Sequence, residues 1–188
     1  MADISDVFTA LATTISNALY PNGTSQPSAI TASCKIYAGW PNSTELDSDI
    51  RSGTVHVSVY AVSNASRNTT RYQPQWRQLT NNGTSGTSIK ELRRQEQRMQ
   101  ITVWAPTPDL RSAASSVIDV TLSNINFLPL ADGSSARIVY VGMVISDMNQ
   151  KSSLFKRDLF YSVEYATTIT ETDSAIKTTT LTISGSQG

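Results

Sequence analysis

One segment near the C-terminus carries the clearest structural pattern in the chain. From Asp158 to Ile169 the sequence reads DLFYSVEYATTI, in which apolar residues alternate with polar ones. A period of two is typical of a β-strand that has one face in a core and the other in solvent. The pattern therefore predicts a long, half-buried strand of an antiparallel sheet.

An earlier segment, KELRRQEQRMQITVWAP, changes character along its length. Its end alternates in the same way, with Met99, Ile101 and Val103 on one face, whereas Lys90 to Arg98 is almost wholly polar. The side chains of that polar half are too polar to be buried in a hydrophobic core. We therefore expect a strand that packs at one end and projects into solvent at the other, where it needs a partner outside its own fold. This expectation favours an assembly protein over an enzyme.

Two helices are predicted from apolar residues at helical spacing. The first runs from Ile4 to Leu19, with Ser5 or Asp6 near its N-terminus as a cap. The second runs from Pro108 to Ile125. Its start is marked by a threonine cap, a proline in the first helical position and an aspartate at the positive end of the helix dipole.

Strands are predicted over residues 34–38, 54–62, 76–80, 127–130 and 136–145. Residues 42–52 are expected to form a polar connection, with one helical turn around Glu45 to Ile50 as an alternative. The arginines near residue 94 would lie on an extended hairpin between Trp76 and Trp104. The predicted fold is α+β: a mostly antiparallel sheet packed by two helices, with a long projecting β-hairpin.

Length and composition restrict the class of protein. The 188 residues suit one domain over residues 1–170, followed by a Ser/Thr-rich tail over residues 171–188. That tail reads either as disordered or as a docking arm whose TTTLTIS end adds to the sheet of a neighbouring subunit. The charges balance to zero, so the whole chain has no drive toward nucleic acid or an anionic membrane. Neither a secretory signal nor a membrane-spanning helix is expected.

Few side chains have a pattern that indicates chemistry. The only histidine, His56, lies between two valines of a predicted strand, and the only cysteine, Cys34, has no base close to it in sequence. Glu45, Asp47 and Asp49 do not have the spacing of an EF-hand, so a solvated acidic turn is favoured over a cation site. We expect no catalytic residues, no cofactor and no metal.

Basic and aromatic residues are instead the candidates for contacts with other subunits. The arginines of the projecting hairpin lie beside Glu91 and Glu96, a pattern that also suits an ordinary mixed-charge surface. The near balance of signs favours pairing with protein, although DNA in a lumen is an alternative partner. Tryptophan and tyrosine supply amphipathic contact area, but the same loops would also fold onto the edge of a core. The predicted contact residues are Arg93, Arg94, Arg98, Lys156, Arg157, Trp40, Tyr72 and Trp76.

The run IYAGWPNSTELDSDIRSGTVHVSVYAVSNASRNTTRY, from Ile36 to Tyr72, resembles a family of tailed-bacteriophage structural proteins. The resemblance continues through ITVWAPTPDLRSAASSVID and KRDLFYSVEYATT, and so covers most of the chain as far as Thr168. The order of elements is similar to that of tail terminator proteins: a helix, strands with a long hairpin, a helix and closing strands. The Ser/Thr-rich stretch from about Asp173 onward is not part of the resemblance.

The resemblance implies a structural role in the virion, without catalysis. A homo-oligomeric ring, usually a hexamer, would cap the tail tube at its head-proximal end. Its partners would be the tail tube protein and a neck or connector protein, with genomic DNA passing through the lumen. Another head-to-tail connector, such as a head-completion or adaptor protein, is the alternative within this class. A carbohydrate-binding module, suggested by Trp40, Tyr72 and Trp76, is a third interpretation.

Overall fold

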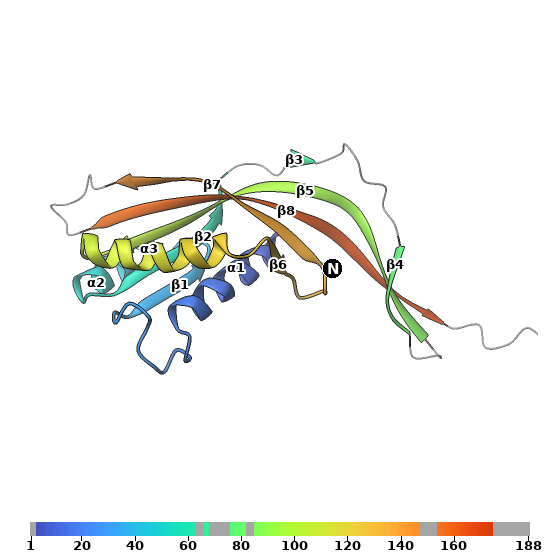
Figure 1. Cartoon of the computed structure of the whole chain (residues 1–188), viewed down its shortest axis with the longest axis horizontal. Coiled ribbons are helices and arrows are strands. Elements are labelled where there is room, and N and C mark those ends of the chain that lie inside the picture. Colours follow the sequence, from blue (N-terminus) through green and yellow to red (C-terminus); the bar gives the residue numbers. More distant parts are fainter. Residues whose placement is uncertain (1–2, 63–65, 68–75, 82–84, 147–153, 175–188) are drawn as a thin grey trace, which may run out of the picture.

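The computed structural model describes residues 3–62, 66–67, 76–81, 85–146 and 154–174. They form an α+β fold with one curled, mixed sheet and three helices (Figure 1). Six strands follow one another in the order β1-β2-β5-β8-β7-β6, while β3 and β4 pair with β5 beside this path. Among the strands of these residues, only β1 and β2 are parallel; every other pair is antiparallel. The strands are β1 (Cys34–Ala38), β2 (Val55–Ala61), β3 (Ser66–Arg67), β4 (Trp76–Asn81), β5 (Ser85–Ala105), β6 (Phe127–Pro129), β7 (Ser135–Ser146) and β8 (Phe155–Ser174).

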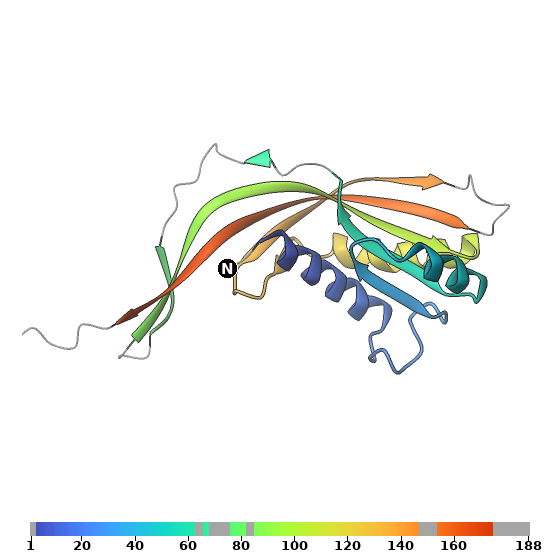
Figure 2. The same ribbon diagram turned by 180° about the vertical axis from the view of Figure 1, so that it is seen from behind.

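The two longest strands, β5 and β8, form a curved arch. They pair antiparallel from Ser85 opposite Ser174 to Ala105 opposite Phe155, with one irregularity between Glu91 and Arg93. The view from behind shows both strands extending beyond the helices and bending down toward the end of the molecule that carries β4 (Figure 2). β8 extends at both ends beyond the segment that the alternation predicted, Asp158 to Ile169. It also continues past residue 170, where the sequence led us to place the end of the domain.

The core lies on the concave face of the arch, where α1 (Ile4–Leu19) and α3 (Pro108–Ser123) pack against the sheet. Side chains that alternate along β5 and β8 point into it, as the period-two patterns predict. Each fully buried Leu or Ile contributes about 1.5–3 kcal/mol relative to its exposed state. Core residues from helices and strands include Val7, Leu11, Ile15, Ile118, Leu122, Met99, Ile101, Val103, Leu159, Tyr161 and Val163.

The helix ends differ in part from the prediction. Asp3, rather than Ser5 or Asp6, caps α1: its Oδ1 accepts a hydrogen bond from the Ser5 amide at 2.7 Å, and Asp6 accepts one from the Asp3 amide at 2.8 Å. This reciprocal pair is a capping box, in which Asp6 takes the place of the usual Glu. Thr107 caps α3 as predicted, but the helix ends at Ser123.

Residues expected to form a polar connection contain a third helix, α2 (Ser43–Arg51), capped by Asn42. Its Asp49 lies beside His56 of β2 on the convex face of the sheet, the face opposite α1 and α3. Both faces of β2 are therefore buried, and His56 and Ser58 are inaccessible to solvent. The prediction of two helices was wrong because α2 buries only Ile50, which leaves almost no apolar stripe in its sequence.

The polar stretch from Lys90 to Arg98, which we expected to project into solvent on a hairpin, pairs with several strands of its own chain. β8 pairs with it throughout, from Ile169 opposite Lys90 to Ser162 opposite Arg98. Its other edge meets β3 at Gln95 and Glu96 and β4 at Lys90, so the end of the sheet near β4 has three strands rather than two. The expectation that this stretch needs a backbone partner from outside its own fold was therefore wrong.

Candidate subunit interface

β7 carries the largest group of exposed apolar side chains in the part of the chain that the structure describes. Each of six large apolar residues on this one strand is between 42% and 53% exposed. A soluble monomer rarely gathers so many exposed apolar side chains in one place, and such gatherings mark interaction sites. These residues are Val139, Tyr140, Val141, Met143, Val144 and Ile145.

The backbone of β7 is paired along only one of its two edges. β8 pairs with it from Arg137 to Ser146, whereas β6 covers its other edge only from Ser135 to Arg137. From Val139 to Ser146, no strand among the described residues pairs with that other edge. We call this stretch the free β7 edge. A row of unpaired amide and carbonyl groups is a template for a strand from another chain.

The free β7 edge also lacks the charges that usually protect a sheet edge. Natural edge strands carry charged residues or proline, or they are very short. The outer edge of β1 is short and includes Lys35, and the far end of β8 includes Glu171 and Asp173. Between Val139 and Ser146 there is no charged residue and no proline, and a bulge near Gly142 is the one protective feature. This edge is therefore the strongest candidate for a binding surface.

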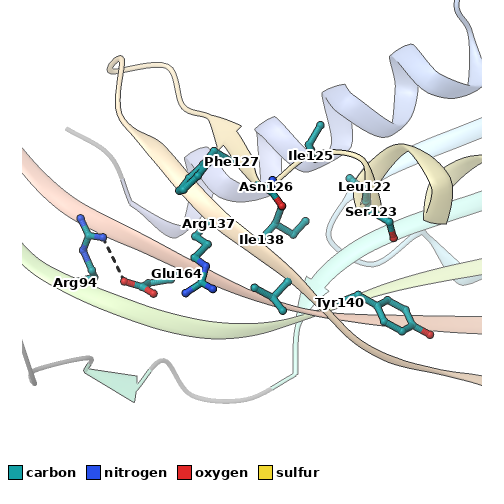
Figure 3. A pocket seen from close by; sticks show the side chains of 11 residues that line it. Arg94, Leu122, Ser123, Ile125, Asn126, Phe127, Arg137, Ile138, Tyr140 and Glu164 are labelled. Atoms are coloured by element: carbon teal, nitrogen blue, oxygen red, sulfur yellow. Dashed lines mark hydrogen bonds and ion pairs between the residues drawn. The ribbon is translucent and has the colours of Figure 1, made fainter.

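A groove of about 810 Å³ opens at the start of the free β7 edge (Figure 3). One wall comes from the end of α3 and the segment that leads into β6, including Leu122, Ile125 and Phe127. The other wall comes from β7 itself, including Val139 and Tyr140. Because these two residues belong to both features, the groove and the free β7 edge are continuous with each other.

An ion-pair network closes the other end of the groove. Arg94 contacts Glu91 at 2.9 Å and Glu164 at 3.3 Å, and the dashed line in Figure 3 marks the contact with Glu164. Hydrogen bonding to Glu91 raises the pKa of the Arg94 guanidinium. Arg137 of β7 lies opposite Glu164 in the strand register and is exposed. The predicted contact residue Arg94 is thus paired with two carboxylates of its own chain.

The other two hairpin arginines lie on the same polar arch. Arg93 Nε donates to Thr167 Oγ1 at 3.3 Å, and the Arg98 guanidinium lies 6.0 Å from the centroid of the Phe160 ring. Both residues are exposed. Their role in contacts with another subunit stays a prediction.

The predicted basic pair Lys156 and Arg157 lies beside the free β7 edge, because Ser146 pairs with Lys156 and Ile145 with Arg157. Lys156 Nζ lies 3.0 Å from Asp158 Oδ2, while Arg157 is half-buried. Both residues thus lie on the strand that pairs with β7, on the side away from its unpaired edge, and their role in contacts with another subunit stays a prediction.

The aromatic candidates do not form one cluster in the described structure. Trp40 is 66% exposed and stacks on Tyr60, with ring centroids 4.2 Å apart, and its ring centroid lies 6.0 Å from that of Trp104. Tyr72 lies outside the described residues. Trp76 begins β4 opposite Lys90 in the register. Trp40 is therefore brought together with two aromatic residues that the sequence did not single out.

The residues with potential for chemistry lie apart from this surface. His56 Nε2 is 3.1 Å from Asp49 Oδ2, and burial lowers the pKa of the imidazole more than Asp49 raises it. Burial also raises the pKa of the Cys34 thiol, which disfavours the reactive thiolate. Within the described ranges, no three His, Cys, Asp or Glu side chains are grouped so as to hold a metal ion, and no helix is long and apolar enough to cross a membrane.

The sequence did contain a signal for the exposed apolar side chains on both faces of β7. Residues 138–145 read IVYVGMVI, a run without the alternation that marks a half-buried strand. Continuous apolar runs are typical of strands covered on both faces. We predicted a strand there but singled out none of its side chains. The missing alternation indicates that a second cover is needed, and the described residues do not supply it.

Comparison with solved structures gives distant likenesses only, whereas the other two comparisons find nothing. No family model matches the chain, and no curated protein matches it. Among solved structures, it is similar to a chain of a structure described as "Virion of native gene transfer agent (GTA) particle". The two chains are 12% identical with a TM-score of 0.37, and the match covers 85% of this chain and 96% of the other.

Proposed function

We propose that this protein is a structural subunit of a phage-like virion that associates with copies of itself. In this proposal the subunits form a ring, a hexamer in the first instance, at the head-proximal end of the tail. The ring stops growth of the tail tube and joins the tail to the neck. Its partners are the tail tube protein on one side and a neck or connector protein on the other, and genomic DNA passes through the lumen.

The observation that carries the proposal is the free β7 edge. Its backbone groups are unpaired from Val139 to Ser146 among the described residues, and its side chains are apolar. Left in water, such an edge is a predicted aggregation site, so a soluble protein keeps it only where a specific partner covers it. A second copy of the chain can serve as this partner, because it is present wherever the first copy is.

The arrangement of surfaces supports a ring rather than a closed dimer. The free β7 edge and the tip of the arch at Ser174 lie at opposite ends of the molecule (Figure 1). When different surfaces of two identical subunits meet, the contact repeats from one subunit to the next and closes into a ring if the rotation allows it. The function is then geometric: a ring matches the last tube ring on one face and the neck on the other.

The proposal predicts that assembly depends on the free β7 edge and not on exposed apolar residues in general. We would introduce Met143→Lys and Val144→Lys together, two substitutions at side chains that are 52% and 53% exposed. The matched control is Val120→Lys on α3, where the side chain is 66% exposed and is not among the residues that line the groove. Because all these side chains are exposed, the monomer should keep its stability in each variant.

Light scattering with size-exclusion chromatography gives the subunit number, and negative-stain electron microscopy gives the shape. We expect rings from the wild-type chain and from the control, and monomers from the double variant. A wild-type chain that stays monomeric over a wide concentration range and is absent from assembled particles would refute the proposal. The position of the ring in a map of the whole particle separates a tail terminator from another head-to-tail connector.

A further inference from the structure

We propose that the free β7 edge binds the segment from Thr178 to Ser184 of a neighbouring copy, which adds to the sheet as an extra strand. This inference rests on the proposed function only in that it requires copies of the chain to associate. It names the two surfaces that meet: the free β7 edge as acceptor, and the C-terminal segment as donor.

The donor sequence suits such an edge. Residues 175–188 lie outside the described part of the chain, but residues 178–184 read TTTLTIS. Threonine and isoleucine favour strands, and Leu181 and Ile183 are spaced to lie on one face while Thr180 and Thr182 lie on the other. The segment has no charged residue, and neither has the acceptor between Val139 and Ser146. Pairing the two would therefore bury no unpaired charge.

The donor segment cannot reach the centre of the edge in its own molecule. Met143 lies opposite Leu159 of β8, and fifteen residues separate Leu159 from Ser174. At about 3.3 Å per residue along a strand, the chain leaves the arch roughly 50 Å from Met143. Nine residues separate Ser174 from Ile183, and fully extended they span at most about 32 Å. The arch bends toward its β4 end, but its tip stays at the end of the molecule opposite the end of β7 (Figure 1), so we take the donor from another copy.

The geometry also favours this contact over pairing between two β7 strands. Two free β7 edges would meet by the same surface on both copies, and such a contact closes at a dimer. Donor and acceptor that lie at opposite ends of the arch make a head-to-tail contact instead, which continues around a ring. The inferred contact is therefore the one that the proposed function needs.

The acceptor has a face for the apolar donor side chains. Tyr140, Met143 and Ile145 lie opposite Tyr161, Leu159 and Arg157 of β8 in the register. Tyr161 and Leu159 point into the core, and directly opposite residues share a face of the sheet, so the three β7 side chains lie on the side of α3. Leu181 and Ile183 would extend that face beside the groove of Figure 3. Backbone hydrogen bonds then supply affinity, and the alternate side chains supply specificity.

Mixed cysteine cross-linking tests which surfaces meet. Met143→Cys and Ile183→Cys are made in separate chains, and the two proteins are mixed and oxidised. The native Cys34 is buried in both chains and should not react. We expect disulfide-linked dimers in the mixture at a yield several times that of either variant alone. A mixture in which Val120→Cys replaces Met143→Cys is the matched control and should give no such increase.

Peptide binding tests whether the contact is a paired strand. The acceptor is the full chain carrying Leu181→Asp and Ile183→Asp, which weakens its own donor segment. The probe is a fluorescent peptide of residues 175–188. We expect it to bind, and to lose at least about tenfold in affinity when its Leu181 amide is methylated, because a methylated amide cannot donate to the β7 backbone. Adding Met143→Lys and Val144→Lys to the acceptor should have a similar effect.

Each outcome separates the inference from the proposed function. If the Leu181→Asp and Ile183→Asp variant forms rings like the wild type, the inference is overturned and the proposed function stands. If Met143→Cys alone cross-links as well as the mixture does, two β7 strands pair with each other and the inference is again overturned. If the wild-type chain forms oligomers that are not rings and the peptide binds only the free β7 edge, the inference is supported and the ring is not.

Discussion

Thr102 is the centre of a buried polar network on the convex face, and replacing it with valine tests how that face is held together. Its Oγ1 donates to Asp158 Oδ1 at 2.7 Å, accepts from Gln100 Nε2 at 3.0 Å and lies 2.9 Å from Tyr60 Oη. A hydroxyl has one proton and two acceptor positions. Because the proton is given to Asp158, Tyr60 must be the donor in the third bond. All the hydrogen-bonding capacity of Thr102 is then used, and the residue is inaccessible to solvent.

The expected loss in stability follows from these three bonds. A hydrogen bond to a charged group contributes about 1.5–3 kcal/mol and a neutral one about 0.5–1.5 kcal/mol. Asp158 keeps its contact with Lys156 at 3.0 Å, so part of its stabilisation remains. We expect Thr102→Val to lower the free energy of unfolding by about 3 kcal/mol, which is roughly 6–12 °C in Tm for a chain of this length. Tyr60→Phe removes only one of the bonds and should cost about 1 kcal/mol.

Urea unfolding followed by circular dichroism measures these changes. Thr102→Ser is the control, because it keeps the hydroxyl and loses only a methyl group. The double variant of Tyr60→Phe and Thr102→Val should cost less than the sum of the single variants, since both remove the same bond. If Thr102→Val lies within about 0.5 kcal/mol of the wild type, the network does not stabilise β2, β5 and β8 against one another and the reasoning is refuted.

Three further changes test other parts of the fold. His56 is the only histidine, and burial lowers its pKa in the folded state, so the free energy of unfolding should fall as the pH drops below 6.5 and the unfolded chain binds the extra proton. In thermal melts, His56→Phe should remove that fall. If the variant shows the same dependence of Tm on pH as the wild type, His56 is not the cause of the fall. Tyr161→Phe removes a hydroxyl that donates to Asp119 at 2.8 Å, and should cost about 1–2 kcal/mol in urea unfolding; no loss would mean that water replaces the bond. Asp3→Ala removes the cap of α1 and should cost about 1 kcal/mol by the same assay, unless the helix recaps at Ser5.

Local patterns predicted the elements that build the core. The apolar stripe of α1 gave both of its bounds, and Thr107-Pro108 gave the start of α3. Alternation located the half-buried part of β8. These signals work because the residues that define them lie on one face of a single element, so no knowledge of the partner is needed.

The stretch from Lys90 to Arg98 was misinterpreted because periodicity shows which face is apolar and not which strand pairs with the backbone. β8 is as long as β5 and supplies the partner. Glu91 is buried even though it is charged, since Arg94 contacts it at 2.9 Å. A polar sequence can therefore be covered within its own fold when opposite charges lie three residues apart along a strand that has a bulge between them.

The free β7 edge, rather than the charged stretch of β5, is the better candidate for a contact between subunits. The carboxylates of Glu91 and Glu164 already neutralise Arg94, and Ser162 donates a hydrogen bond to Glu96 across β5 and β8. Charges that are satisfied within one chain gain little from a second chain, because the new pair must first give up the old one. The free β7 edge has no such internal competitor among the described residues. Burying its side chains and pairing its backbone in an added strand would both favour association, so it is the part of this molecule from which a stable subunit contact would gain most.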